Sequence, residues 1–195
     1  MDNRAKMIEA RIPVEAQQTT LSKLGWVSLR EGIVAGNSSP MVFAPKDIKN
    51  VEGASLLFYT YAKETRLSGS TLVCVSLAEL VAVVFNDLEE FRSSVLAGVT
   101  ARTLQSMDAL AVSGFCDTGT TFLTPQQKYT VASFLLTMMR NGKKVILGLD
   151  VDRPLDTWWP TQLAMYLVKN ATFTVCGGGK YERRPQVFVS CRGEW

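Results

Sequence analysis

The chain contains no histidine in 195 residues. Histidine is the most frequent general acid or base near neutral pH and a common metal ligand, so serine–histidine and cysteine–histidine catalytic pairs are excluded. The four cysteines lie far apart, with no C-x-x-C pair, and thiolate zinc sites are not expected. The sequence also lacks a Walker-type phosphate loop and a nucleophile elbow. These absences favour a binding or structural protein without a cofactor over an enzyme, and leave acid- or lysine-based catalysis open.

Long hydrophobic runs are missing as well. The longest, such as Leu80–Phe85, are far shorter than the roughly 20 residues that span a bilayer. The N-terminus carries mixed charge with no apolar block behind it, which does not fit a secretory signal. We therefore expect a cytoplasmic (intracellular) protein without a membrane-spanning segment. A hydrophobic content of 47% and a net charge of +3 are typical of a folded, mildly basic globular chain.

The first part of the chain carries weak signals. Short strands are predicted at Trp26–Leu29, Ile33–Ala35 and Met41–Ala44, broken by turn residues. We expect residues 1–53 to form an N-terminal arm or edge strands, and residues 54–195 to form a single α+β core domain. The core would open with a β-hairpin, whose strands are predicted at Leu56–Ala62 and Thr71–Val75.

Central helices follow, and two of them begin at capping boxes. Ser76 precedes Glu79 by three residues, which predicts a helix from about 77 to 97. A second helix is predicted from 101 to about 112. Thr124, followed by Pro125 and Gln127, predicts a third helix that ends at Asn141-Gly142.

The C-terminal part is predicted to run strand, helix, strand, strand. The segments are 144–149, 160–169, 171–176 and 186–191. An order of strands, then helices, then this ending favours an α+β fold over a strictly alternating sheet.

Basic and aromatic residues gather towards the C-terminus, around the glycine run Gly177–Gly179. The run lacks the Walker spacing, and a plain hairpin loop remains the simpler interpretation. Arginines interleaved with aromatic rings are nevertheless what single-stranded RNA or DNA binding uses. The candidate nucleic-acid-binding residues are Lys143, Lys144, Lys180, Tyr181, Arg183, Arg184 and Arg192.

Three tryptophans are candidate interface residues: the adjacent pair Trp158 and Trp159, and the C-terminal Trp195. Tryptophan is enriched at interface hot spots, whereas packing in the core is its usual place. Both interpretations stay open at this point.

Asp150 and Asp152 follow an apolar strand, where two carboxylates could share Mg²⁺. The run Ile146–Asp152 resembles the nucleophile strand of haloacid-dehalogenase-like phosphatases. That family also needs a downstream lysine and an acidic pair, and the residues after Asp152 contain no such acidic motif. A turn at Asp152-Arg153-Pro154 is the structural alternative.

The sequence therefore favours a non-enzymatic, self-associating structural protein that contacts single-stranded RNA or another polyanion. An arm together with a basic patch would suit a viral structural, matrix or movement protein. The alternatives are a Mg²⁺-dependent phosphate-handling enzyme built on Asp150 and Asp152, and a protein-interaction adaptor that uses the tryptophan pair and the arm.

Overall fold

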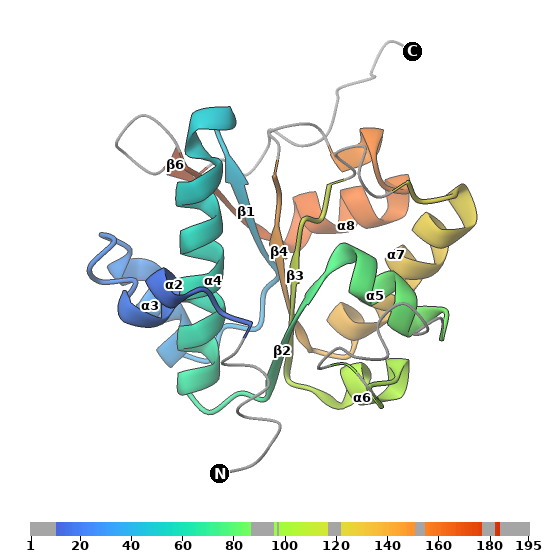
Figure 1. Ribbon diagram of the computed structural model, residues 1–195, viewed down its shortest axis with the longest axis horizontal. Helices are drawn as coiled ribbons and strands as arrows, with labels where there is room; N and C mark the ends of the chain where they lie inside the picture. The colour runs from blue at the N-terminus through green and yellow to red at the C-terminus, as the bar shows by residue number, and fades with distance from the viewer. Residues whose placement is uncertain are drawn as a thin grey trace.

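A six-stranded sheet lies at the centre of the structure, a computed structural model that describes residues 11–86, 96, 98–116, 122–150, 155–176 and 182–183. The strand order is β2-β3-β4-β1-β5-β6, with the first five strands parallel and β6 antiparallel to β5 (Figure 1). The strands are β1 (Met41–Pro45), β2 (Leu72–Ser76), β3 (Ala109–Ser113), β4 (Lys144–Gly148), β5 (Thr172–Cys176) and β6 (Glu182–Arg183). The expected mixture of helices and strands is confirmed.

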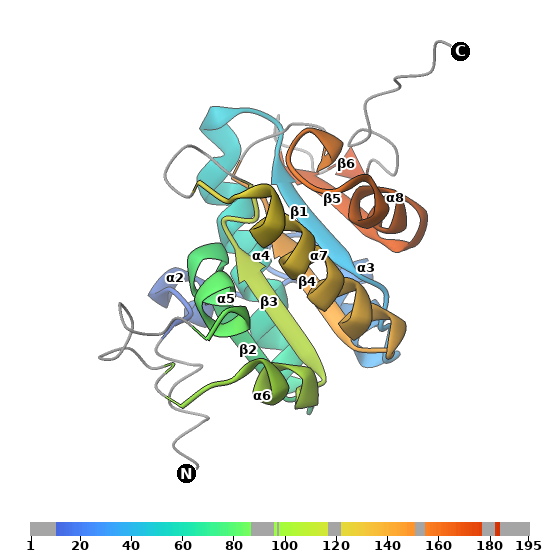
Figure 2. The same ribbon diagram turned by 90° about the vertical axis from the view of Figure 1, so that its right-hand side faces the viewer.

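Helices cover both faces of the sheet, because parallel strands require crossover connections (Figures 1 and 2). One face carries α2 (Val14–Gln18), α3 (Val27–Val34) and α4 (Val51–Leu67), which follows the short helix η1 (Ile48–Asn50). The other face carries α5 (Leu77–Val84), α6 (Ala101–Ser106), α7 (Pro125–Arg140), η3 (Leu155–Thr157) and α8 (Thr161–Asn170). None of the helices described is long and apolar enough to cross a membrane.

The inner strands are buried on both faces and are therefore almost continuously apolar. Phe43 of β1 packs against Phe58 and Tyr61 of α4, in the cluster under that helix. The next residue along the strand, Ala44, belongs to the cluster under α5, α7 and α8. At Gly148 an added Cβ would lie 3.0 Å from the Phe58 ring, so the helix approaches the sheet where β4 has no side chain.

Several predicted elements are confirmed. Both capping boxes are present and start α5 and α7, where Ser76 and Thr124 each accept a hydrogen bond from the third helical N–H. The strand predicted at 144–149 is β4, the helix at 160–169 is α8, and the strand at 171–176 is β5. Met41–Ala44 lies in β1, between β4 and β5 in the sheet.

Other predictions for the N-terminal half were wrong. Leu56–Ala62 lies within α4 rather than in a hairpin strand. Trp26–Leu29 and Ile33–Ala35 fall in and beside α3 instead of forming strands. The strand predicted at Thr71–Val75 exists as β2, but its partner is the parallel strand β3.

The central helices are also shorter than predicted. α5 ends at Val84, and Asn86 takes a positive φ of 55°. The helix predicted from 101 to 112 ends at Ser106, and Ala109–Ser113 forms β3.

The expected boundary between the N-terminal arm and the core domain, after residue 53, falls inside α4. The strand predicted at 186–191 lies outside the described residues.

Candidate functional site

β1 and β4 are neighbouring parallel strands, and the connections that follow them lead to opposite sides of the sheet. Such a place is a topological switch point. β1 continues into α4 on one face, whereas the chain after β4 leads to α8 on the other. In open α/β sheets, ligands bind at such a switch point, outside the carboxyl ends of the strands. Asp150 lies there, with its Oδ2 3.4 Å from the position that a Cβ on Gly114 would take. Burial raises the pKa of this carboxyl.

The described residues do not assemble the proposed magnesium site. Lys143 and Lys144 lie at the start of β4, and Asp150 follows its far end, so these lysines do not converge with that carboxylate. Asp152 and Lys180 fall outside the described residues. Within the part of the chain that is described, no group of three His, Cys, Asp or Glu side chains could hold a metal ion.

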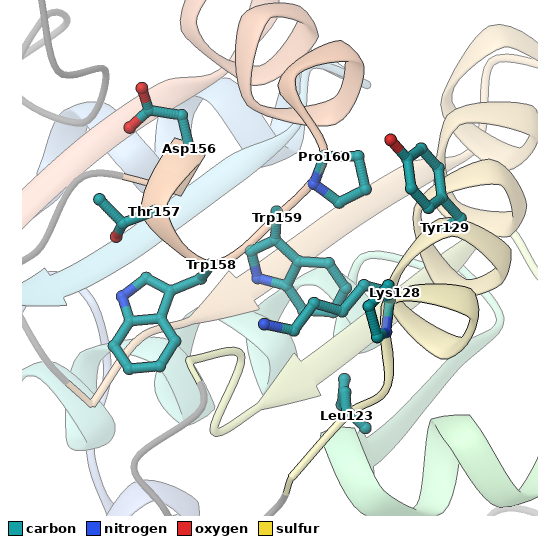
Figure 3. Close-up of a pocket in the computed structure, with 9 residues that line it drawn as sticks. Leu123, Lys128, Tyr129, Asp156, Thr157, Trp158, Trp159 and Pro160 are labelled. Carbon is teal, nitrogen blue, oxygen red and sulfur yellow. The ribbon is translucent and has the colours of Figure 1, made fainter.

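The adjacent tryptophans have different surroundings (Figure 3). Trp159 is 4% exposed and stacks on Phe115, with the ring centres 4.3 Å apart. Its Nε1 donates a hydrogen bond of 2.9 Å to the Phe115 carbonyl. Trp159 is therefore a core residue rather than an interface anchor. Trp158 is half-buried, and the Lys128 Nζ lies 6.0 Å from the centre of its ring.

Trp158 and Lys128 line a hollow of about 220 Å³ at the start of α7. A second hollow, of about 460 Å³, lies between α7 and α8. Tyr129 and Pro160 line both hollows, so the two adjoin, and together they are here called the α7–α8 groove. Its lining residues are Leu123, Pro125, Lys128, Tyr129, Thr130, Ala132, Ser133, Leu136, Thr137, Arg140, Asp156, Thr157, Trp158, Trp159, Pro160 and Gln162.

α7 presents one exposed stripe to this groove. Tyr129, Ser133, Thr137 and Arg140 recur every three or four residues and so share one side of the helix. The Tyr129 side chain is 63% exposed and offers an aromatic ring to solvent. The stripe thus combines a ring, two hydroxyls and a guanidinium, while the opposite side of α7 supplies Val131, Leu135 and Met138 to the core.

The groove is nearly free of negative charge. Asp156 is the one acidic side chain among its lining residues. In the sequence, residues 118–149 and 157–181 contain neither aspartate nor glutamate, so α7 and α8 are free of both. Lys128, Arg140 and Lys169 supply positive charge on these helices. The helices on the other face of the sheet, in contrast, carry Glu15, Glu31, Glu52 and Glu64.

Sequence reasoning missed Lys128 and Tyr129 as site residues. Their signal was the long acid-free segment around a predicted amphipathic helix, which is visible in the sequence. Trp158 was predicted as an interface residue, and the structure places it beside Lys128.

Lys144, a predicted nucleic-acid contact, is only 7% exposed. Its ammonium group lies 5.0 Å from the centre of the Tyr61 ring, and burial lowers its pKa to about 8. The side chain lines a hollow formed by residues just beyond the C-termini of α3, α4 and α7. Helix C-termini are electronegative and favour a nearby cation, and Asp108 lines the same hollow as this buried lysine.

The remaining predicted contacts are not brought together by the described structure. Lys143 is half-buried beside the same hollow as Lys144. Arg183 contributes backbone to β6, which pairs with β5. Lys180, Tyr181, Arg184, Arg192 and Trp195 lie outside the described residues.

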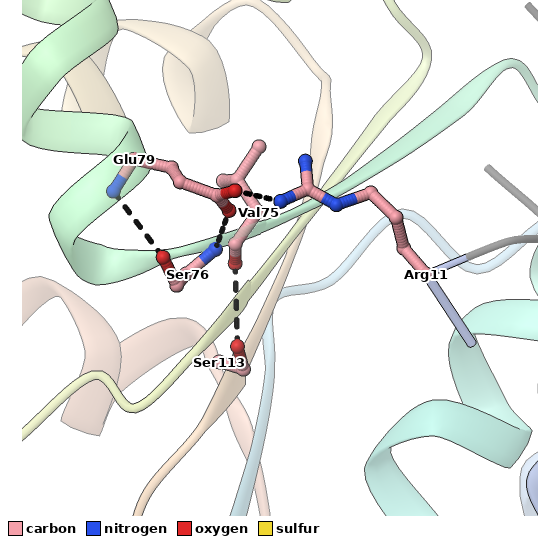
Figure 4. Close-up of polar contacts among 5 residues, drawn as sticks. All are labelled: Arg11, Val75, Ser76, Glu79 and Ser113. Carbon is pink, nitrogen blue, oxygen red and sulfur yellow. Dashed lines mark hydrogen bonds and ion pairs between the residues drawn. The ribbon is translucent and has the colours of Figure 1, made fainter. Parts of the chain in front are cut away.

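A fourth hollow, at the carboxyl ends of β2 and β3, contains polar groups that bind one another (Figure 4). The Glu79 carboxylate accepts a hydrogen bond of 2.7 Å from the Ser76 N–H and pairs with Arg11. Burial lowers the Arg11 pKa. The Ser113 hydroxyl donates to the Val75 carbonyl at 3.5 Å. The ion pair joins Arg11 to the first turn of α5.

No family model and no curated protein matches the chain by sequence. Solved structures do match its fold. The fold is shared with the replication initiator DnaA. A structure of DnaA from Aquifex aeolicus bound to AMPPCP has a TM-score of 0.58 at 12% identity, and the match covers 84% of this chain and 51% of that one.

Two further structures match at 12% identity. A replication initiator DnaA bound to AMPPCP and single-stranded DNA has a TM-score of 0.54, with 88% of this chain and 50% of that chain covered. A DNA replication initiation factor has a TM-score of 0.57, with 82% and 49% covered. The chain therefore spans about half the length of the DnaA-like structures it matches. At 12% sequence identity, this structural similarity shows the fold alone.

Two of these structures hold AMPPCP, a nucleoside triphosphate analogue. In this chain, the strand–loop–helix unit at the switch point runs from β1 to α4. Residues 46–50 connect β1 to α4 and contain no glycine. A phosphate loop needs glycines that let backbone N–H groups surround the phosphates, and a lysine followed by serine or threonine. The residues present do not fit a nucleoside triphosphate.

Proposed function

We propose that this protein binds single-stranded nucleic acid in the α7–α8 groove. The observation that carries the proposal is a pair of adjoining hollows lined by aromatic and cationic side chains, beside two helices that contain no acidic residue. Nucleic-acid affinity comes mainly from neutralised phosphates, and a negatively charged surface would oppose it.

The side chains of the groove match the two parts of a nucleic-acid strand. Lys128 precedes the stripe on α7 and Arg140 ends it, a separation along the helix axis of about 18 Å at 1.5 Å per residue. They can contact phosphates at separate points along one strand. Tyr129, next to Lys128, offers an exposed ring, and the half-buried Trp158 lines the same hollow as Lys128. Bases stack on such rings whatever their sequence.

The fold comparison supports the same class of partner. One of the matching structures is of DnaA bound to single-stranded DNA. The basic residues 180–192, predicted from the sequence, would add a second contact to the strand. Self-association, a structural role of the viral type and an intracellular location were also expected from the sequence, and they remain predictions.

The test is a binding titration with a fluorescent single strand of about 16 nucleotides, the upper end of site sizes for one small domain. We expect affinity to fall linearly with salt on a logarithmic scale. Tyr129→Ala should weaken binding by about 1–3 kcal/mol through lost stacking. Lys128→Ala and Arg140→Ala should each weaken binding of all sequences and reduce the salt slope by about 1.

Lys23→Ala is the matched control, because Lys23 is exposed between α2 and α3 on the other face of the sheet. It removes the same charge as Lys128→Ala and should leave the affinity nearly unchanged. Equal losses in the two variants would show that only net charge matters and would contradict the proposal. Light scattering of the same samples measures self-association.

A further inference from the structure

The loop between β1 and α4 lies where a phosphate-binding loop would lie, at the start of the helix that leaves the switch point. Helix N-termini attract anions, because their first N–H groups have no partner within the helix and the helix dipole is positive there. In this chain, η1 and α4 are consecutive over residues 48–67. Asp47 is the N-cap of η1, and Asn50, the N-cap of α4, makes no side-chain cap hydrogen bond.

The chain supplies its own anion at this position. The Asp47 carboxylate accepts a hydrogen bond of 2.9 Å from the Lys49 backbone N–H. The same oxygen accepts a second, of 2.7 Å, from the Asn50 side-chain amide. The Asn50 N–H donates to the Asp47 carbonyl at 3.0 Å, and the Lys46 N–H donates to the Cys176 carbonyl at 2.7 Å. Three of the five backbone N–H groups of residues 46–50, and the Asn50 side-chain amide, thus donate to acceptors within the protein.

We infer that the β1–α4 junction does not take up a nucleoside triphosphate, because the Asp47 carboxylate holds the place that a phosphate group would need. A triphosphate would have to displace this carboxylate and would then face its negative charge. The loop also lacks the glycines that would let it wrap around phosphates. The inference does not depend on whether the α7–α8 groove binds nucleic acid.

The first test is isothermal calorimetry of the wild-type protein with ATP and Mg²⁺ at concentrations up to about 1 mM, the upper end of ordinary substrate KM values. We expect no saturable binding. Saturable binding that Lys46→Ala and Lys49→Ala both weaken would overturn the inference, since these lysines flank the loop.

The second test asks whether removing the carboxylate opens an anion site. Inorganic phosphate, compared with chloride at equal ionic strength, should not change the melting temperature of the wild type. It should raise that of Asp47→Ala by a few degrees, because a ligand that binds only the folded state stabilises it. Asp47→Asn keeps an acceptor for the loop donors and should behave like the wild type.

Glu52→Ala is the charge-matched control, since Glu52 is exposed in the first turn of α4. An equal phosphate effect in Glu52→Ala and Asp47→Ala would contradict the inference, as would no effect in Asp47→Ala. Calorimetry of the wild type tests whether the protein binds ATP even if Asp47→Ala does not fold.

Discussion

Lys144 is a buried residue whose surroundings make the stability of the protein depend on pH. Its side chain is buried against Tyr61, and Lys143 and Asp108 line the same hollow. Burial lowers its pKa to about 8, whereas an unfolded chain keeps the proton to about 10.4. Between these values the unfolded state binds more protons, so this group makes the protein more stable as pH rises.

Urea unfolding of the wild type and Lys144→Met at pH 7.5 and 9.5 tests this expectation. The free energy of unfolding of the wild type, relative to that of the variant, should increase with pH by on the order of 1 kcal/mol. Burial raises the pKa of Tyr61, so the tyrosine stays protonated in the folded protein over this range. A difference that stays constant with pH would show that the lysine proton is held equally in both states.

At the scale of elements, α7 carries the groove, and its start is fixed by a capping box. The Thr124 side chain accepts a hydrogen bond from the Gln127 N–H at 3.2 Å, and the Gln127 side chain accepts one from the Thr124 N–H at 2.9 Å. Thr124→Ala should lower the free energy of unfolding by about 1 kcal/mol, whereas Thr124→Ser should retain most of it. Chemical denaturation measures both. Equal losses in the two variants would show that the hydroxyl cap contributes nothing.

Capping boxes are also what made α5 and α7 predictable, because they are local patterns of side chains with a fixed spacing. Leu56–Ala62 was mistaken for a strand because it contains Phe58, Tyr59 and Tyr61, which are frequent in sheets. Packing overrides that preference: Leu57, Phe58, Tyr61 and Ala62 lie on the buried side of α4 at helical spacing. The apolar run at Ala109–Ser113 has no periodicity, so it could not be told from a helix.

The pairing of strands was not predictable in the same way. Hairpins are signalled by short turns between strands, whereas β1 pairs with β4 and β5, from which it is separated by about a hundred residues. The α7–α8 groove depends on this arrangement. α7 precedes β4 and α8 precedes β5, and the two helices are neighbours because β4 and β5 lie on either side of β1. Its residue types were visible in the sequence, but their proximity was not.

At the scale of the whole molecule, the sheet separates two helical layers of different charge. The layer with α7 and α8 presents the groove, whose lining contains Asp156 as its single acidic side chain. The layer with α2, α3 and α4 carries four glutamates together with Arg30, Lys63 and Arg66. Net charge alone, at +3, gives only a weak long-range attraction for a polyanion. The location of the charge therefore matters more than its sum. An equal change of charge in the two layers should change the affinity for a polyanion by unequal amounts.

Paired charge insertions test this asymmetry. Ser133→Glu with Thr137→Glu places two carboxylates on the exposed stripe of α7, and Ser28→Glu with Val34→Glu places two on exposed positions of α3. Both variants change the net charge by the same amount. The α7 variant should lower affinity for a single strand at least about tenfold at low salt, because like charges then line the groove. The α3 variant should change this affinity about twofold or less, since the sheet and the opposite helices separate those carboxylates from the bound nucleic acid. Melting temperatures of both variants show whether the fold is intact, and equal losses of affinity in two folded variants would place the interface elsewhere on the molecule.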